Sequence, residues 1–211
     1  ALVQSKGQPD LPAAWPAYQR VREAVAADFR RYRSGYRHLP DARGTAVDHA
    51  TYQNWSCLLS PHGHLRRAGM LMSKNWMANV WSWDHCFNAL ALAKADPELA
   101  WDQFMLIFDH QLTSGQLPDM INDQVRQYNI VKPPIHGWTI DWMLRLQPSL
   151  AGRERLETIY RVLARWTEWW FRHRDPDATL LPCYHDGCDS GWDNGTSFDI
   201  GVPVQGPDLD R

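Results

Sequence analysis

The sequence predicts an all-α fold of about six helices, arranged as part of a helical toroid. In most of the chain, apolar residues recur at steps of three and four, and few segments alternate with period two. The predicted helices are paired by short turns, and longer loops alternate between the pairs. Such pairs need neighbouring pairs to bury both faces, as in bundles, solenoids and toroids. No repeat of 34 or 40 residues is evident, which disfavours a regular solenoid.

The first two helices are predicted over residues 17–33 and 45–59. In the first, apolar residues recur at helical steps and arginines occupy much of the rest, which is typical of an amphipathic helix. The second ends before Pro61. Residues 62–82 lack clean periodicity, and an irregular loop or a short hairpin is expected between Leu65 and Val80.

The third helix is predicted to begin near Asp84 and to end near Lys94. Asp96 then supplies an N-cap residue with proline at the first helical position, which is a strong start signal. We expect this fourth helix to end at Ser114-Gly115. It is predicted to present one apolar face, formed by Ala100, Phe104, Ile107, Phe108 and Gln111.

The last two helices follow a proline-containing loop over residues 115–135. One is predicted over 136–146, and the other has the clearest pattern and ends near Arg172, before Asp175-Pro176-Asp177. The apolar seam of this last helix is expected to consist of Leu156, Ile159, Tyr160, Leu163 and Trp170.

Composition excludes several classes of protein. The charged fraction is 22% and the formal net charge is −2, without the basic stripe of a nucleic-acid-binding protein. No apolar run approaches the roughly 18 residues of a membrane span. The N-terminus lacks the pattern of a secretory signal, so a cytoplasmic location is favoured, although a signal removed earlier would leave the same sequence.

The four cysteines are scattered through a chain of ordinary composition, which makes a disulfide scaffold an unfavoured interpretation. Cys183, His185 and Cys188 lie close together, but their C-x-H-x-x-C spacing matches no standard zinc-finger spacing. We therefore predict neither a metal nor another cofactor. The 12 tryptophans allow two interpretations, a thick aromatic core or a carbohydrate cleft.

The segment Asp189 to Gly195 carries the strongest candidate for catalysis. Asp193 directly follows the indole of Trp192, between Gly191 and Gly195, in a sequence typical of a tight loop. An indole beside a carboxyl disfavours ionisation and raises the carboxyl pKa, as a general acid in glycoside cleavage requires. The alternative is a surface Asx-turn with a packed tryptophan.

Two further loops are rich in polar groups. One contains Trp81, Trp83, Asp84 and His85; a carboxylate beside indoles can grip a sugar ring, although Asp84 could instead be a helix N-cap. The other spans residues 115–123 and offers Gln116, Asn122 and two aspartates, Asp119 and Asp123; its alternative is a solvated turn between helices. We expect all three loops to lie on one rim of the fold.

These motifs, in this order, resemble glycoside hydrolase family 63, especially its bacterial α-glucosidase-like and mannosylglycerate hydrolase-like members. The matching motifs are W-x-W-D-H at 81–85, G-Q-L-P-D at 115–119, Gly137-Trp138 after a proline-rich loop, and S-G-W-D-N at 190–194. The resemblance covers roughly residues 70–200. It implies an (α/α)6 toroid, inverting hydrolysis of an α-linked sugar and Asp193 as the general acid. It also implies a sugar subsite formed by Trp81, Trp83, Asp84, His85, Gln116, Asp119, Trp138 and Trp192.

The chain departs from the family in one respect. An inverting enzyme needs a second carboxylate as base, which in the family is a glutamate far downstream, whereas the last glutamate here is Glu168. Six helices are also half of the twelve that the toroid needs. We therefore expect residues 1–211 to form a single domain, the N-terminal half of a catalytic domain, which would be inactive alone. Its expected partners are an oligosaccharide or glycoside substrate and the missing half or a second chain. Asp84 and Asp119 are the alternative bases.

Other classes of function stay open at this point. One is a non-catalytic carbohydrate-binding or interaction protein on a degenerate toroid, in which Asp193 accepts a hydrogen bond from a sugar hydroxyl. Another is a plain helical scaffold whose tryptophans all belong to the core.

Overall fold

The computed structural model describes residues 16–40, 44–72, 77–185, 187–192 and 195. The chain groups into two compact units, residues 1–55 and 56–211. Six α-helices and five two-residue strands are found in the described ranges, so the predicted all-α class and the number of helices are confirmed. None of these helices is both long and apolar enough to cross a membrane.

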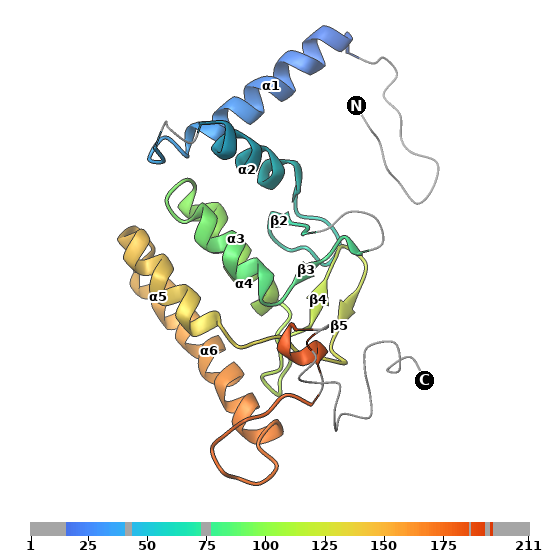
Figure 1. Cartoon of the computed structure of the whole chain (residues 1–211), viewed down its shortest axis with the longest axis vertical. Coiled ribbons are helices and arrows are strands. Elements are labelled where there is room, and N and C mark those ends of the chain that lie inside the picture. Colours follow the sequence, from blue (N-terminus) through green and yellow to red (C-terminus); the bar gives the residue numbers. More distant parts are fainter. Residues whose placement is uncertain (1–15, 41–43, 73–76, 186, 193–194, 196–211) are drawn as a thin grey trace. The chain divides into compact units, whose positions relative to one another are not determined.

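The first unit is built on α1 (Tyr18–Ser34) and α2 (Gly44–Ser56) (Figure 1). The ring of Phe29 packs edge-on against Tyr52 and lies 5.3 Å from the ring of Trp55. The predicted α1 is confirmed, but none of its residues is buried within the described structure. The predicted second helix is three residues too long at its C-terminal end, because Leu58 and Leu59 form a strand instead.

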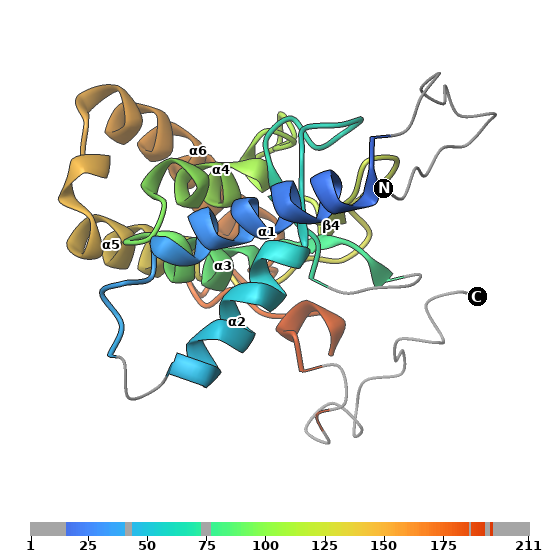
Figure 2. The same cartoon turned by 90° about the horizontal axis from the view of Figure 1, so that it is seen from above.

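The second unit contains α3 (Asp84–Leu92), α4 (Pro97–Phe108), α5 (His136–Leu146) and α6 (Arg153–His173). Figures 1 and 2 show these helices beside one another, with the short strands gathered at one side of them. The predicted start of α4 is confirmed: the Asp96 side chain accepts a hydrogen bond of 3.0 Å from the backbone N–H of Leu99.

Helix α4 is more deeply buried than its sequence predicts. Besides the expected face, Trp101, Gln103, Met105 and Leu106 are buried, because α3 packs on one side and the strand β2 (Gly69–Met70) contacts another. Gln103 bridges that strand, accepting from the N–H of Met70 at 2.9 Å and donating to the carbonyl of Ala68 at 2.7 Å. Gln103 can therefore be buried in the core, because both its amide oxygen and its amide nitrogen are hydrogen-bonded.

The predicted end of α4 at residue 114 is wrong, because the helix ends at Phe108. Beyond it, the carbonyl of His110 accepts from the hydroxyl of Tyr128, and the N–H of Leu112 donates to the carbonyl of Gln116. These non-helical partners satisfy the backbone groups that would otherwise continue the helix.

The seam predicted for α6 is partly wrong. Tyr160 is 74% exposed and Leu156 is exposed as well, whereas Ile159 and Trp170 are buried as expected. The buried side of the helix is completed by Trp166 and Trp169, whose rings stack with centroids 5.2 Å apart. Indoles bury more apolar area than leucine or tyrosine side chains, so the tryptophans decide which side of α6 faces the core.

Short antiparallel strands pair the loop segments with one another. β1 (Leu58–Leu59) pairs antiparallel with β2, and β3 (Val80–Trp81) pairs with β4 (Met120–Ile121), which pairs with β5 (Arg126–Gln127). The hairpin expected within residues 65–80 is therefore wrong in its pairing: its two ends pair with strands outside that range. The β3–β4 pair brings together two loops that are about forty residues apart in the sequence.

Candidate functional site

The three polar loops meet at one buried cation. The Nζ of Lys132 donates to the carbonyl of Cys188 at 2.9 Å and lies 3.4 Å from Oδ1 of Asp119. It also lies 5.5 Å from the centroid of the Trp81 ring. Lys132 is 5% exposed. One side chain thus contacts the first two loops that the sequence singled out and Cys188, the residue directly before the third.

The first two loops are joined through the backbone. Ser82 N–H donates to the carbonyl of Asp119 at 2.9 Å, and the N–H of Asp119 donates to the carbonyl of Gln127 at 2.7 Å. Asp119 is buried, so the alternative of a solvated turn is wrong for this residue. Gln116 is half-buried, and its Nε2 donates to the carbonyl of Tyr128 at 2.8 Å.

The third loop is anchored by Asp189. Its carboxylate accepts from Nη1 of Arg174 at 2.8 Å and from the backbone N–H groups of Val131 and His185, both at 2.9 Å. Both members of this ion pair are buried. The guanidinium of Arg174 also lies over the ring of Trp169, 5.4 Å from its centroid. The segment that precedes Asp193 is therefore held firmly to α6.

An aromatic patch, defined by Trp83, Phe87 and Trp138, adjoins the third loop. The rings of Trp83 and Phe87 are 5.8 Å apart, and those of Phe87 and Trp138 are 6.2 Å apart. Phe87 is 48% and Trp138 49% exposed. Gly191 has φ of +71°, and a Cβ placed there would lie 2.7 Å from Cζ2 of Trp83. The loop backbone therefore packs directly on this indole, as only glycine allows.

Asp84 and His85 occupy the start of α3 but differ in exposure. Trp83 is the N-cap residue, so the interpretation of Asp84 as the N-cap is wrong; the half-buried Asp84 lies in the first turn, where a carboxylate complements the helix dipole. His85 is fully buried, and its Nδ1 lies 3.1 Å from the carbonyl of Trp81. Desolvation lowers the pKa of His85 to about 4, so its imidazole is neutral.

The structure describes both ends of the third loop but not Asp193, the residue predicted to be the general acid. Trp192 is strongly exposed, and its backbone N–H donates to Oγ of Ser190 at 3.0 Å. Asp193 lies outside the described residues, between Trp192 and Gly195.

Two buried cationic residues of the candidate site, Lys132 and Arg174, were not predicted from the sequence. Lys132 lies between Val131 and Pro133 in a stiff apolar segment, and a lysine in such a setting was a signal for a buried ion pair. Arg174 carried no comparable signal, because its partner Asp189 is fifteen residues away and is reached only through the fold.

Comparisons with known proteins show the family to which the chain belongs. A family model for the mannosylglycerate hydrolase MGH1-like glycoside hydrolase domain matches residues 77–208. Curated mannosylglycerate hydrolases of Rubrobacter radiotolerans and Thermus thermophilus are 25% and 27% identical to this chain over 170 and 149 residues, covering 64% and 59% of it. The chain spans 38% and 36% of the length of these relatives.

Solved structures also match this chain in fold. An uncharacterized conserved protein from Thermus thermophilus matches with 25% identity and a TM-score of 0.57, covering 70% of this chain and 38% of its own. A GH63 mannosylglycerate hydrolase from the same organism, in complex with Tris and D-glycerate, matches with 22% identity and a TM-score of 0.58. That match covers 80% of this chain and 44% of the hydrolase. The predicted fold, the first half of an (α/α)6 toroid, is confirmed.

Proposed function

Because the chain belongs to the mannosylglycerate hydrolase MGH1-like glycoside hydrolase family, within glycoside hydrolase family 63 as its motifs predicted, we propose that it carries the acid-bearing half of a glycosidase active site. The reaction is the inverting hydrolysis of an α-linked sugar. Asp193 is the general acid that protonates the leaving oxygen, and a carboxylate from outside these 211 residues is the base. Neither carboxylate is a described residue, so their roles rest on the family resemblance.

The observation that carries this proposal is the convergence of the three loops on Lys132. Its contacts with Asp119, Trp81 and the Cys188 carbonyl hold the sugar-binding motifs and the root of the acid loop in one place. A glycosidase needs such a fixed arrangement, because the acid must meet the glycosidic oxygen in a productive geometry. A plain helical scaffold has no need of a buried lysine there.

The substrate is an α-linked glycoside, and mannosylglycerate is the first candidate. Two curated relatives carry that substrate in their names, and one solved relative is complexed with D-glycerate. In this chain, the aromatic patch offers indole faces to the apolar side of a sugar ring, with the half-buried Asp84 next to Trp83 as a hydroxyl acceptor. An α-glucoside is the competing substrate.

Hydrolysis of the glycoside requires a catalytic base in addition to the residues discussed above. In an inverting enzyme the acid and base stand about 6.5–9.5 Å apart, with a water molecule between base and sugar. Asp119 is a poor base, because it is buried and its Oδ1 already lies 3.4 Å from Nζ of Lys132 in an ion pair. The chain alone is therefore expected to bind sugar without hydrolysing it, and a further segment or second chain completes the site.

Binding is tested by titrating mannosylglycerate and methyl α-glucoside into the purified chain in a calorimeter. Trp83→Ala is expected to weaken binding by about 1–3 kcal/mol, as for stacking on other flat ligands. The matched control is Phe171→Ala, an exposed aromatic residue on α6 outside the patch, which is expected to bind normally. Unaltered binding by Trp83→Ala together with a large loss of stability would assign Trp83 to the core and contradict the sugar site.

The acid role is tested in a completed enzyme that contains this chain. Asp193→Asn keeps the side-chain shape but removes the transferable proton, so kcat is expected to fall on the order of 10²–10⁴-fold for substrates with poor leaving groups. Substrates with activated leaving groups need less protonation and are expected to lose less. Equal losses on both kinds would show that Asp193 binds the sugar, as in the alternative function of a non-catalytic carbohydrate-binding protein.

A further inference from the structure

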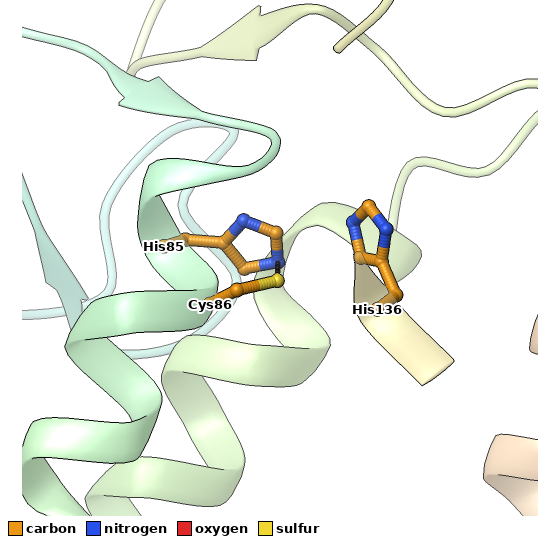
Figure 3. A group of neighbouring side chains, drawn as sticks. All are labelled: His85, Cys86 and His136. Atoms are coloured by element: carbon orange, nitrogen blue, oxygen red, sulfur yellow. Dashed lines mark hydrogen bonds between the residues drawn. The ribbon is translucent and has the colours of Figure 1, made fainter. Parts of the chain in front are cut away.

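A second group of chemically capable side chains lies in the core beneath the first loop. His85 and Cys86 come from the first turn of α3, and His136 begins α5 (Figure 3). One nitrogen of each imidazole and the sulfur of Cys86 all lie within 4.8 Å of one another. All three residues are essentially inaccessible to solvent.

His136 is unusual because neither of its buried ring nitrogens has a hydrogen bond of normal geometry, although the backbone of Ser82 lies beside the ring. Its surroundings are aromatic: the rings of Phe108 and Trp166 lie 5.3 and 6.1 Å away. An unsatisfied buried polar group destabilises the fold, and a bound water or ion is a common explanation for one. In Figure 3 the ring of His136 faces the side chains of His85 and Cys86.

His85 has the orientation of a metal ligand. Its Nδ1 lies 3.1 Å from the carbonyl of Trp81 and therefore donates its N–H to that oxygen. Its Nε2 lies 3.8 Å from Sγ of Cys86, and the backbone of Phe104 is a second hydrogen-bonding group beside this imidazole. Histidines that bind metals almost always donate the other ring N–H to a carbonyl or carboxylate in this way, which fixes the tautomer.

We propose that Nε2 of His85, Sγ of Cys86 and a ring nitrogen of His136 form a binding site for a thiophilic transition-metal ion of the Zn²⁺ class. Around tetrahedral zinc, metal–sulfur and metal–nitrogen bonds of about 2.3 and 2.0–2.1 Å place ligand atoms about 3.3–3.6 Å apart. The present separations, 3.8 Å and at most 4.8 Å, need only small side-chain movements to reach that geometry. Neutral imidazoles and a sulfur ligand also suit this class of metal.

Binding releases one proton. Burial raises the pKa of the Cys86 thiol to about 12, so the sulfur is protonated in the absence of metal and must lose its proton to solvent when the metal–sulfur bond forms. The ion would tie the start of α3 to the start of α5 and, through His85, fix the carbonyl of Trp81. The site shares His85 with the sugar subsite that the family resemblance implies, but metal binding does not depend on the hydrolytic chemistry.

The test begins with the metal content of the purified whole chain, measured by mass spectrometry after purification with added zinc and removal of loose metal. About one equivalent per chain is expected, together with a higher Tm in zinc than in a chelator. Cobalt substitution adds a geometric readout, because a thiolate–Co²⁺ bond gives a charge-transfer absorption. Cys86→Ala is expected to lose both the absorption and the zinc-dependent rise in Tm.

The matched control is the double variant Cys183→Ser/Cys188→Ser, which removes the other two thiols near a histidine and is expected to keep both signals. Loss of metal in this control, with retention in Cys86→Ala, would move the site to the loop and overturn the proposal. No stoichiometric metal and no zinc-dependent change in Tm of the unmodified chain would also overturn it. If Cys86→Ala does not fold, the cobalt spectra of the other two proteins test the site. The thiolate–Co²⁺ absorption is expected in both the unmodified chain and the control variant, and its absence from the unmodified chain would overturn the proposal.

Discussion

Lys132 is a buried cation whose neighbours come from three different loops. Burying an ammonium group is costly unless an anion and hydrogen-bond acceptors surround it, and here the carboxylate of Asp119 and the carbonyl of Cys188 provide them. The indole of Trp81 adds a cation–π contact. The same side chain therefore contributes to stability and positions the candidate site.

Replacing Lys132 with Met keeps most of the side-chain volume but removes the charge beside the buried Asp119. Removal of one member of a buried ion pair typically costs about 3–5 kcal/mol, so we expect the free energy of unfolding to fall by that amount. Urea denaturation followed by tryptophan fluorescence measures it. The double variant Lys132→Met/Asp119→Asn removes both charges and is expected to be more stable than Lys132→Met alone. Strict additivity in this double-mutant cycle would mean that the two residues do not interact.

At this scale the sequence predicts some site residues and misses others. Trp83, Asp84 and Gln116 stand out because their types and motif spacing carry chemical meaning without knowledge of the fold. Lys132 and Arg174 act through buried ion pairs, which depend on contacts between segments far apart in the chain. His85 is a different case: the sequence motif singles out this residue, but its burial is known only from the structure.

Among the elements, the turn between α4 and the second loop has a strict backbone requirement. Gly115 has φ of +101°, and a Cβ there would lie 2.3 Å from the carbonyl oxygen of Arg165 on α6. Gln111 donates to the carbonyls of both Gly115 and Val162, which fastens the same turn to α6. This turn therefore sets how the segment carrying Gln116 and Asp119 leaves the helices.

Gly115→Ala is expected to destabilise the chain by about 1–3 kcal/mol from backbone strain, with a further cost from the contact with Arg165. The control is Gly137→Ala, which lies inside α5 with no atom within 4 Å of the added methyl group. That change is expected to be neutral or to stabilise by up to about 1 kcal/mol, since alanine favours helix. Thermal unfolding of the two variants compares them. Equal stability of both would contradict the tight packing of the turn on α6.

The elements themselves are better predicted than their ends. All six helices appear where periodicity places them, because an apolar repeat every three or four residues is a local signal. The end of α4 and the buried side of α6 are not local properties: they depend on Tyr128 capping one segment and on which tryptophans the core accepts. The strand pairing of β3 with β4 joins residues about forty positions apart, which no short-range pattern encodes.

For the molecule as a whole, the two units differ in how well each covers its own apolar residues. The second unit buries a continuous core around α4. The first unit has an apolar groove of about 600 Å³ between α1 and α2, lined by Pro16, Tyr18, Val21, Arg22, Val25, Ala26, Phe29, Tyr52 and Trp55. Monomeric proteins seldom leave large contiguous apolar surfaces in water. The described residues of the first unit therefore leave this apolar surface open to water.

The purified chain is accordingly expected to bind a hydrophobic dye such as ANS and to self-associate as its concentration rises. Val25, 49% exposed, lines the groove, so Val25→Lys is expected to lower dye fluorescence without loss of stability. Tyr160→Lys changes a more exposed residue on α6, outside the groove, and is expected to leave dye binding unaltered. Fluorescence titration and light scattering on the three proteins make the comparison. A monodisperse monomer that binds no dye would show that the groove needs no cover, and an equal effect of both substitutions would show that dye binding is not localised to it.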